Sequence, residues 1–138
     1  MSWPRGYSFM ELVVVLVIAG ILAAVVVPRF NQPEVDAAWF YEQVKSGVRY
    51  AQRQAVAQRR SVYVVVDATT LRLCYDAGCA SPVSDFGKAA SYQLTAPSGV
   101  SLTPATFSFN GLGQPSAGTT FSVGALSVNI VAETGYVP

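Results

Sequence analysis

The chain has 138 residues, of which 51% are hydrophobic and 12% charged, and its formal net charge is +1. This length suits one small domain, and the nearly neutral charge gives no overall attraction to nucleic acid. The absence of histidine and the presence of only two cysteines remove the commonest general base and metal ligand, so we expect a protein that is not an enzyme and needs no cofactor.

An apolar segment begins a few residues from the N-terminus. The run Leu12–Val27 is unbroken, and residues 7–28 contain only two strongly polar side chains, Ser8 and Glu11. An α-helix of that length rises roughly 30 Å and can cross a bilayer. A carboxylate near the bilayer centre costs roughly 2.5–3.5 kcal/mol on insertion scales. The sequence therefore predicts a membrane-spanning helix over residues 7–28, with Glu11 as the first functional candidate.

A secretory signal peptide is the alternative interpretation of this segment, but its apolar core usually has about 7–15 residues and ends at a small-x-small cleavage site. Here the run is longer, contains Glu11 near its start and ends in Val25-Val26-Val27-Pro28, a poor site for signal peptidase. Gly20 and Pro28 are weak points of the predicted helix, because Gly costs about 1 kcal/mol relative to Ala and Pro removes a backbone donor. We expect the helix to bend or loosen between them.

An amphipathic helix is predicted next, over residues 29–60. Pro33 suits the first turn of this helix, and Glu34 and Asp36 favour its positive end. Apolar residues recur at steps of three and four, which predicts one face packed on a core. These residues are Ala37, Phe40 or Tyr41, Val44, Val48, Ala51 and Ala55.

Six of the nine basic residues of the chain also fall in or next to this helix, so the segment is locally positive. A solvated helix face is one interpretation. Contact with acidic neighbours, lipid head groups or nucleic acid is the other. The residues are Arg29, Lys45, Arg49, Arg53, Arg59 and Arg60.

Short runs of β-branched and aromatic residues, separated by turn residues, make up residues 61–138 and predict an antiparallel β domain. The segment 80–90 has weak periodicity and is expected to loop out. The strands are expected over residues 61–67, 71–75, 92–95, 100–103, 106–109, 119–123 and 126–132. The expected fold class is α+β, with a long N-terminal membrane-spanning helix that continues into the amphipathic helix, itself packed on a β-sandwich-like domain.

The two cysteines, Cys74 and Cys79, flank the turn-like sequence Tyr75-Asp76-Ala77-Gly78. A disulfide around so small a loop would contribute about 2 kcal/mol in the chain-entropy model and implies an oxidising compartment. A metal site is the less favoured alternative, because two thiols without histidine or a second cysteine pair are poor zinc ligands.

The sequence Arg5-Gly6-Tyr7-Ser8-Phe9-Met10-Glu11, with the apolar run and Pro28 after it, resembles the cleavage and methylation signature of type IV pilins and type II secretion pseudopilins. The resemblance implies that residues 1–6 are a leader, that a prepilin peptidase cuts between Gly6 and Tyr7, and that the new Tyr7 amine is methylated. Tyr7 and Ser8 depart mildly from the usual Phe and Thr. The resemblance also implies that Glu11 serves assembly by pairing with the Tyr7 amine of an adjacent subunit.

Three later stretches, residues 50–60, 107–115 and 133–137, are similar to the GspH/FimT group of minor pilins and pseudopilins, and within that group to the C-type minor subunit of mannose-sensitive haemagglutinin (MSHA) pili. The resemblance implies the pilin fold, in agreement with the pattern above. It also implies a single-pass protein of the bacterial inner membrane with a periplasmic C-terminal domain. The implied partners are other pilins or pseudopilins, a prepilin peptidase and an inner-membrane assembly platform.

The expected function is that of a minor structural subunit of an MSHA-type or other type IV pilus, or of a type II secretion filament. A DNA-binding minor pilin for DNA uptake is the alternative, since some FimT-like proteins use a basic C-terminal tail. Only Arg72 and Lys88 are basic beyond Arg60, and residues 135–138 contain no basic side chain, which argues against nucleic acid as a partner. A membrane-anchored periplasmic enzyme is less favoured still, because a usual hydrolase triad needs histidine.

Overall fold

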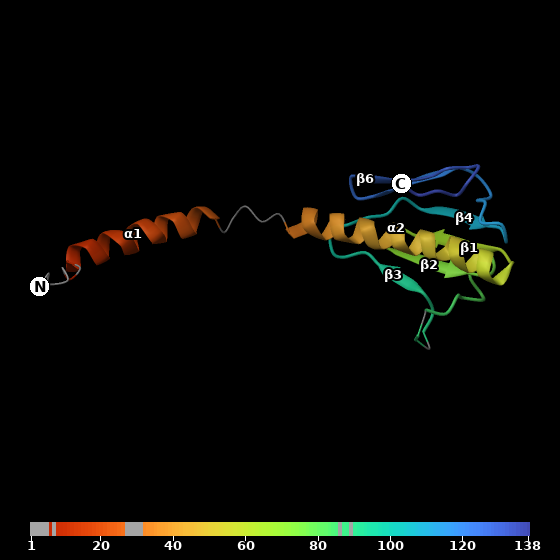
Figure 1. Cartoon of the computed structure of the whole chain (residues 1–138), viewed down its shortest axis with the longest axis horizontal. Coiled ribbons are helices and arrows are strands. Elements are labelled where there is room, and N and C mark those ends of the chain that lie inside the picture. Colours follow the sequence, from red (N-terminus) through yellow and green to blue (C-terminus); the bar gives the residue numbers. More distant parts are fainter. Residues whose placement is uncertain (1–5, 7, 27–31, 86, 89) are drawn as a thin grey trace, which may run out of the picture. The chain divides into compact units, whose positions relative to one another are not determined.

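The structure is a computed structural model that describes residues 6, 8–26, 32–85, 87–88 and 90–138. The chain divides into two compact units, residues 1–32 and 33–138, and each is described by itself (Figure 1). The elements in chain order are α1 (Phe9–Val26), α2 (Gln32–Gln58), β1 (Val62–Val66), β2 (Thr70–Cys74), β3 (Gln93–Thr95), β4 (Ala105–Phe109), β5 (Thr119–Val123) and β6 (Leu126–Ile130).

The first unit contains α1, which begins where Ser8 accepts backbone hydrogen bonds from Glu11 (2.9 Å) and Leu12 (3.2 Å). The helix runs through Gly20 without interruption over its 18 residues. Within the described residues, no helix is both long and apolar enough to cross a membrane. Residues 7, 27 and 28 of the predicted span over residues 7–28 lie outside the described part, so this span stays a prediction.

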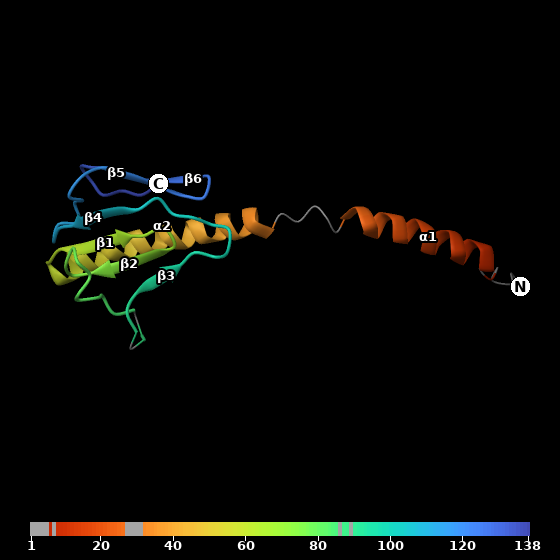
Figure 2. The same ribbon diagram turned by 180° about the vertical axis from the view of Figure 1, so that it is seen from behind.

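The second unit packs α2 against a four-stranded antiparallel sheet in the order β3-β2-β1-β4. Figures 1 and 2, seen from opposite sides, show α2 along one face of this sheet. Strand β1 alternates buried and half-buried residues, as a strand with one covered face should. The predicted apolar face of α2 is confirmed, since Phe40, Val44, Val48, Ala51 and Ala55 are all buried in the core.

A second sheet consists of the hairpin β5–β6. Its Phe121 ring lies 6.2 Å from the ring of Phe107 on β4, measured between centroids. On the other side, the Tyr41 hydroxyl of α2 donates to the Ser127 carbonyl of β6 (3.2 Å). The hairpin therefore covers the core between β4 and α2. With two helices and antiparallel sheets, the predicted α+β class is confirmed.

The strand predicted over residues 100–103 is wrong, because this segment shares its backbone hydrogen bonds between different neighbours. The Leu102 amide donates to Ala68 beside β1 and β2 (2.9 Å), whereas the Thr103 amide donates to Ser122 of β5 (3.0 Å). Leu102 thus forms only an isolated bridge with Val123. The apolar pattern marks buried residues here, but these residues join the two sheets and do not form a ladder of their own.

Helix α2 ends at Gln58 and not at Arg60 as predicted, and residues 29–31 of the predicted helix lie outside the described part. The Arg60 amide donates to Ala55 (3.2 Å) and the Arg59 amide to Val56 (3.3 Å). With a φ of 50° at Arg59, this arrangement is a Schellman motif, which satisfies the last carbonyl groups of a helix.

Candidate functional site

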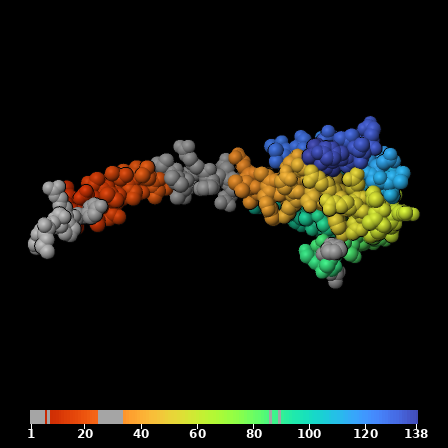
Figure 3. Space-filling view, viewed as in Figure 1, coloured from red at the N-terminus to blue at the C-terminus, as the bar shows by residue number. Residues whose placement is uncertain are grey.

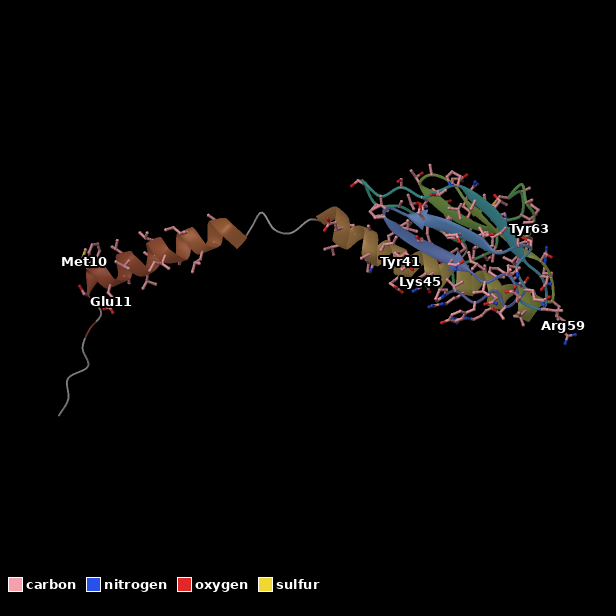
Figure 4. All side chains as sticks on the ribbon, turned by 90° about the horizontal axis from the view of Figure 1, so that it is seen from above. Met10, Glu11, Tyr41, Lys45, Arg59 and Tyr63 are labelled. Carbon is pink, nitrogen blue, oxygen red and sulfur yellow. A yellow bond between two sulfur atoms is a disulfide. The ribbon has the colours of Figure 1, made fainter. Side chains whose placement is uncertain are left out.

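Glu11, the predicted assembly residue, lies in the first turn of α1 (Figure 4). Ser8 and Glu11 have the spacing of a capping box, a local signal that our sequence reasoning missed. The N-terminal end of a helix favours a negative charge by about 0.3–1 kcal/mol. None of the ion pairs among the described residues includes Glu11. Glu11 is also exposed, so its carboxylate is open to a cation from another molecule.

A hollow of about 330 Å³ lies beside Glu11 along α1, lined otherwise by Leu12, Val15 and Leu16. The surface of this hollow is entirely apolar, so Glu11 contributes the stem of its side chain to it and not its carboxylate. The hollow thus offers an apolar surface next to a charged group.

The rest of the α1 surface is apolar and uncovered. A helix that is hydrophobic on every side is found in the interior of an assembly or in a membrane, and an exposed apolar surface of this size marks an interaction site. The large exposed residues are Phe9, Met10, Leu12, Val13, Val14, Val15, Leu16, Val17, Ile18, Ile21 and Leu22.

The predicted processing site falls at the edge of the described residues. Gly6 is exposed, and a Cβ placed there would have no neighbour within 4 Å. Tyr7, the residue expected to be methylated, and Pro28, the expected end of the helix, lie outside the described residues. Cleavage between Gly6 and Tyr7 stays a prediction.

The three stretches that carry the GspH/FimT resemblance meet at one place on α2. The Gln52 side chain donates to the carbonyl groups of Gly113 (2.8 Å) and Thr134 (3.0 Å). One turn earlier, the Arg49 guanidinium donates to Val137 (3.0 Å), whose side chain is buried. We call Gln52, Arg49 and their three carbonyl partners the C-terminal clamp. Its role is structural, since it ties the end of the chain to α2.

Cys74 and Cys79 form a disulfide, with 5.1 Å between their Cα atoms, so the predicted pairing is confirmed. Both oxygens of the Asp76 carboxylate accept backbone hydrogen bonds from the two residues that follow this loop, Ala80 (2.7 Å) and Ser81 (2.9 Å). The disulfide and the carboxylate therefore fix the same turn.

An aromatic and amide ladder, formed by Tyr92, Tyr50, Gln54, Gln58 and Tyr75, connects α2 to the disulfide loop. The rings of Tyr50 and Tyr92 stack with 5.2 Å between centroids. The Tyr50 hydroxyl accepts from Gln54 (2.6 Å), while Gln58 donates to Gln54 (3.0 Å) and to the Tyr75 hydroxyl (2.9 Å). Burial is the main cause that raises the pKa of Tyr92. The negative charges of Asp85 and of Tyr50 raise this pKa further. The phenol is held neutral, which suits a packing role.

Several basic residues of the α2 segment make contacts inside the chain and do not form a free basic face. Lys45 pairs with Glu42 (3.3 Å) and lies over the Tyr41 ring. The Arg60 guanidinium lies 3.8 Å from the centre of the Tyr75 ring. Arg49 belongs to the clamp. Arg53 and Arg59 form no ion pair with any residue that the structure describes.

No group of three or more His, Cys, Asp or Glu residues that could hold a metal ion occurs within the described ranges. The Cys74 and Cys79 thiols are consumed by the disulfide.

The chain matches no protein-family model and no curated protein sequence. It is similar in structure to the type IV minor pilin FimU of Pseudomonas aeruginosa (strain PAO1), solved in two crystal forms. One comparison gives a TM-score of 0.54 at 15% identity over 78% of this chain and 87% of FimU. The other gives a TM-score of 0.52 at 14% identity over 76% of this chain and 90% of FimU. This protein has a type IV pilin-like fold.

Proposed function

We propose that this chain is a minor structural subunit of a filament of the type IV pilus or type II secretion class, and that it performs no chemistry of its own. One observation carries the proposal. The described part of α1 is apolar on every side and carries a single carboxylate in its first turn, while 78% of the chain matches the fold of a type IV minor pilin. An apolar helix of this kind requires a partner that covers it, and the helices of neighbouring subunits supply one.

Glu11 gives such a bundle its register. In a low-dielectric helix bundle an unpaired carboxylate is strongly penalised, whereas a carboxylate paired with an amine is tolerated. The proposed amine is the N-terminal group of Tyr7 on an adjacent subunit, exposed and methylated after a prepilin peptidase cuts behind Gly6. The apolar hollow beside Glu11 supports this pairing, because it places apolar surface around the charge.

Before assembly, we propose, the chain resides in the bacterial inner membrane as a single-pass protein, with residues 7–28 in the bilayer and the domain of α2 and β1–β6 in the periplasm. The disulfide between Cys74 and Cys79 supports an oxidising compartment for this domain. An inner-membrane assembly platform would then deliver the subunit to the filament. The sequence resemblance points to an MSHA-type or other type IV pilus or to a type II secretion pseudopilus, and the neighbouring genes would separate these machines.

The DNA-binding alternative receives no specific support. A protein that neutralises phosphates needs basic side chains that are free and close together. Lys45, Arg49 and Arg60 are engaged inside the domain, and the C-terminal residues are clamped against α2 without a basic group among them.

The proposal is tested with two variants of the assembly residue. Glu11→Gln keeps the size and loses the charge, whereas Glu11→Asp keeps the charge. We expect Glu11→Gln to be cleaved and stable in the membrane yet missing from sheared filaments, because the Tyr7 amine of its neighbour has no partner. Glu11→Asp serves as the matched control and should retain a measurable part of the wild-type level. Equal amounts of Glu11→Gln and wild type in filaments would exclude the assembly role of Glu11.

A further inference from the structure

Helix α2 presents an apolar pair at its N-terminal end. Val35 and Trp39 are one turn apart, and their exposed fractions are 63% and 65%, although Trp is normally well buried. The acidic residues Asp36 and Glu42 stand three positions before and after Trp39, so they flank it on the helix surface. We call these four residues the acidic knob.

The other end of the same helix carries a hollow of about 520 Å³, lined by Val56, Arg59, Gly111 and Leu112. Leu112 is 82% exposed and Val56 47% exposed, so two apolar side chains beside Arg59 are open to a partner. We call these four residues the basic hollow. Figure 4 shows the Arg59 side chain projecting from the end of α2 into solvent.

Arg59 occupies a position where glycine would be the more favourable residue. Its φ of 50° lies in the left-handed region, which penalises side chains with a Cβ. Gly111 packs directly on its backbone, since a Cβ at Gly111 would lie 2.9 Å from the Arg59 carbonyl carbon. The chain thus holds a guanidinium beside exposed apolar residues at the expense of local backbone strain, and such strain is concentrated at functional positions.

The charges of α2 are divided between its two ends. Its three carboxylates, on Glu34, Asp36 and Glu42, all precede Lys45. After Lys45, every charged residue of the helix and of the two residues that follow it is basic: Arg49, Arg53, Arg59 and Arg60. The outer side of the helix lies at the surface in orange and yellow in Figure 3. An acidic apolar surface at one end and a basic apolar surface at the other are complementary between two molecules.

We propose that a second copy of this chain docks head to tail, with the acidic knob of one copy seated in the basic hollow of the next. The Trp39 indole would lie against Val56 and Leu112 and beneath the Arg59 guanidinium, because Trp is the best cation–π partner of Arg. Asp36 would face the basic end of α2, while Glu42 keeps its pair with Lys45 of its own helix. This contact rests on the proposed function and deepens it, since it names a second subunit contact outside α1.

Geometry and charge favour this occupant over others. Trp39 and Arg59 lie about 30 Å apart along one helix, at 1.5 Å per residue, so a knob cannot reach the hollow of its own chain. The two surfaces differ, which makes the contact heterologous, and a heterologous contact that does not close forms an open filament. A symmetric contact of two knobs would oppose carboxylates. An anionic lipid surface would likewise repel Asp36 and Glu42.

The test uses the full chain in cells that assemble the filament, with a photo-crosslinking amino acid in place of Val35 so that Trp39 is retained. We expect a crosslinked dimer whose joined peptide contains Val56–Arg59 or Leu112. The same probe in place of Ala90, an exposed residue of the loop between β2 and β3, is the control and should give no such dimer. Crosslinks to lipid, to another pilin or to a different surface of the second copy would overturn the proposal, as would no dimer above the control.

Two variants separate docking from folding. Arg59→Gly relieves the left-handed backbone, so its thermal stability should equal or exceed that of wild type while the dimer yield falls about tenfold. Arg59→Glu should also lose the dimer, and the charge exchange Arg59→Glu with Asp36→Arg should restore it. A wild-type dimer yield in Arg59→Gly, or no rescue by the charge exchange, contradicts the contact.

The amount of chain in sheared filaments, measured in the same cells, distinguishes failure of the docking contact from failure of the proposed function. If wild type enters filaments but the Val35 probe does not mark the basic hollow, the docking contact is wrong and the filament role stands. If the probe marks the hollow but no chain enters filaments, the filament role is wrong and the contact between copies stands.

Discussion

Replacing Gly135 by Ala should disrupt the C-terminal clamp. Gly135 has a φ of 68°, and a Cβ there would lie 2.6 Å from the Gly113 carbonyl oxygen and 2.7 Å from the Gln52 side-chain nitrogen. The left-handed backbone costs about 1–2 kcal/mol for a residue with a Cβ. Moving Gln52 would in addition lose two hydrogen bonds, each worth about 0.5–1.5 kcal/mol. The expected loss of unfolding free energy is therefore about 2–5 kcal/mol, out of about 5–15 kcal/mol for a typical domain.

The assay is urea unfolding of the fragment Pro33–Pro138, which forms one compact unit and contains every strand. Gly78→Ala is the matched control, because a Cβ at Gly78 meets nothing within 4 Å and the change should stay within about 0.5 kcal/mol. If Gly135→Ala lies within about 1 kcal/mol of wild type, the clamp does not hold the C-terminal segment as described.

Two further predictions concern the disulfide loop and the aromatic ladder. Replacing both Cys74 and Cys79 by Ser should lower the unfolding free energy of the fragment by about 2 kcal/mol; no change, measured in the same urea assay, would show that the Asp76 turn suffices. The pKa of Tyr92 is raised in the folded state, so folding disfavours its phenolate, and the associated stability is full below about pH 10 and lost as the pH rises above it. Tyr92→Phe should therefore lose less stability than wild type as the pH rises above about 10, and identical alkaline slopes in thermal unfolding would contradict this.

Most of the fold was predictable because its signals are periodic and local. The buried positions of α2 follow from spacing at steps of three and four, and β1 follows from its run of β-branched residues. The strand expected over residues 100–103 failed for a reason that lies in the tertiary structure. Leu102 and Thr103 bond to different sheets, and a run of apolar residues carries no information on which partners its backbone will find.

The candidate sites were predictable to different degrees. Glu11 stood out as a single charge in an apolar run, and the pair Cys74 and Cys79 stood out by spacing. The basic hollow was not predictable, since Arg59 meets Gly111 and Leu112 only after the loop that follows β4 folds onto the end of α2. The Schellman motif at Arg59 was hidden as well, because the usual signal for it is glycine.

The central claim, that this chain is a processed filament subunit, is tested most directly by the intact mass of the protein recovered from sheared filaments. We expect the chain to be present there and to begin at Tyr7 with one methyl group on its amine. Its mass should be lower by the two hydrogens lost in the bond between Cys74 and Cys79. Absence of the chain from filaments, or a chain that still begins at Met1, would show that it is not a processed filament subunit.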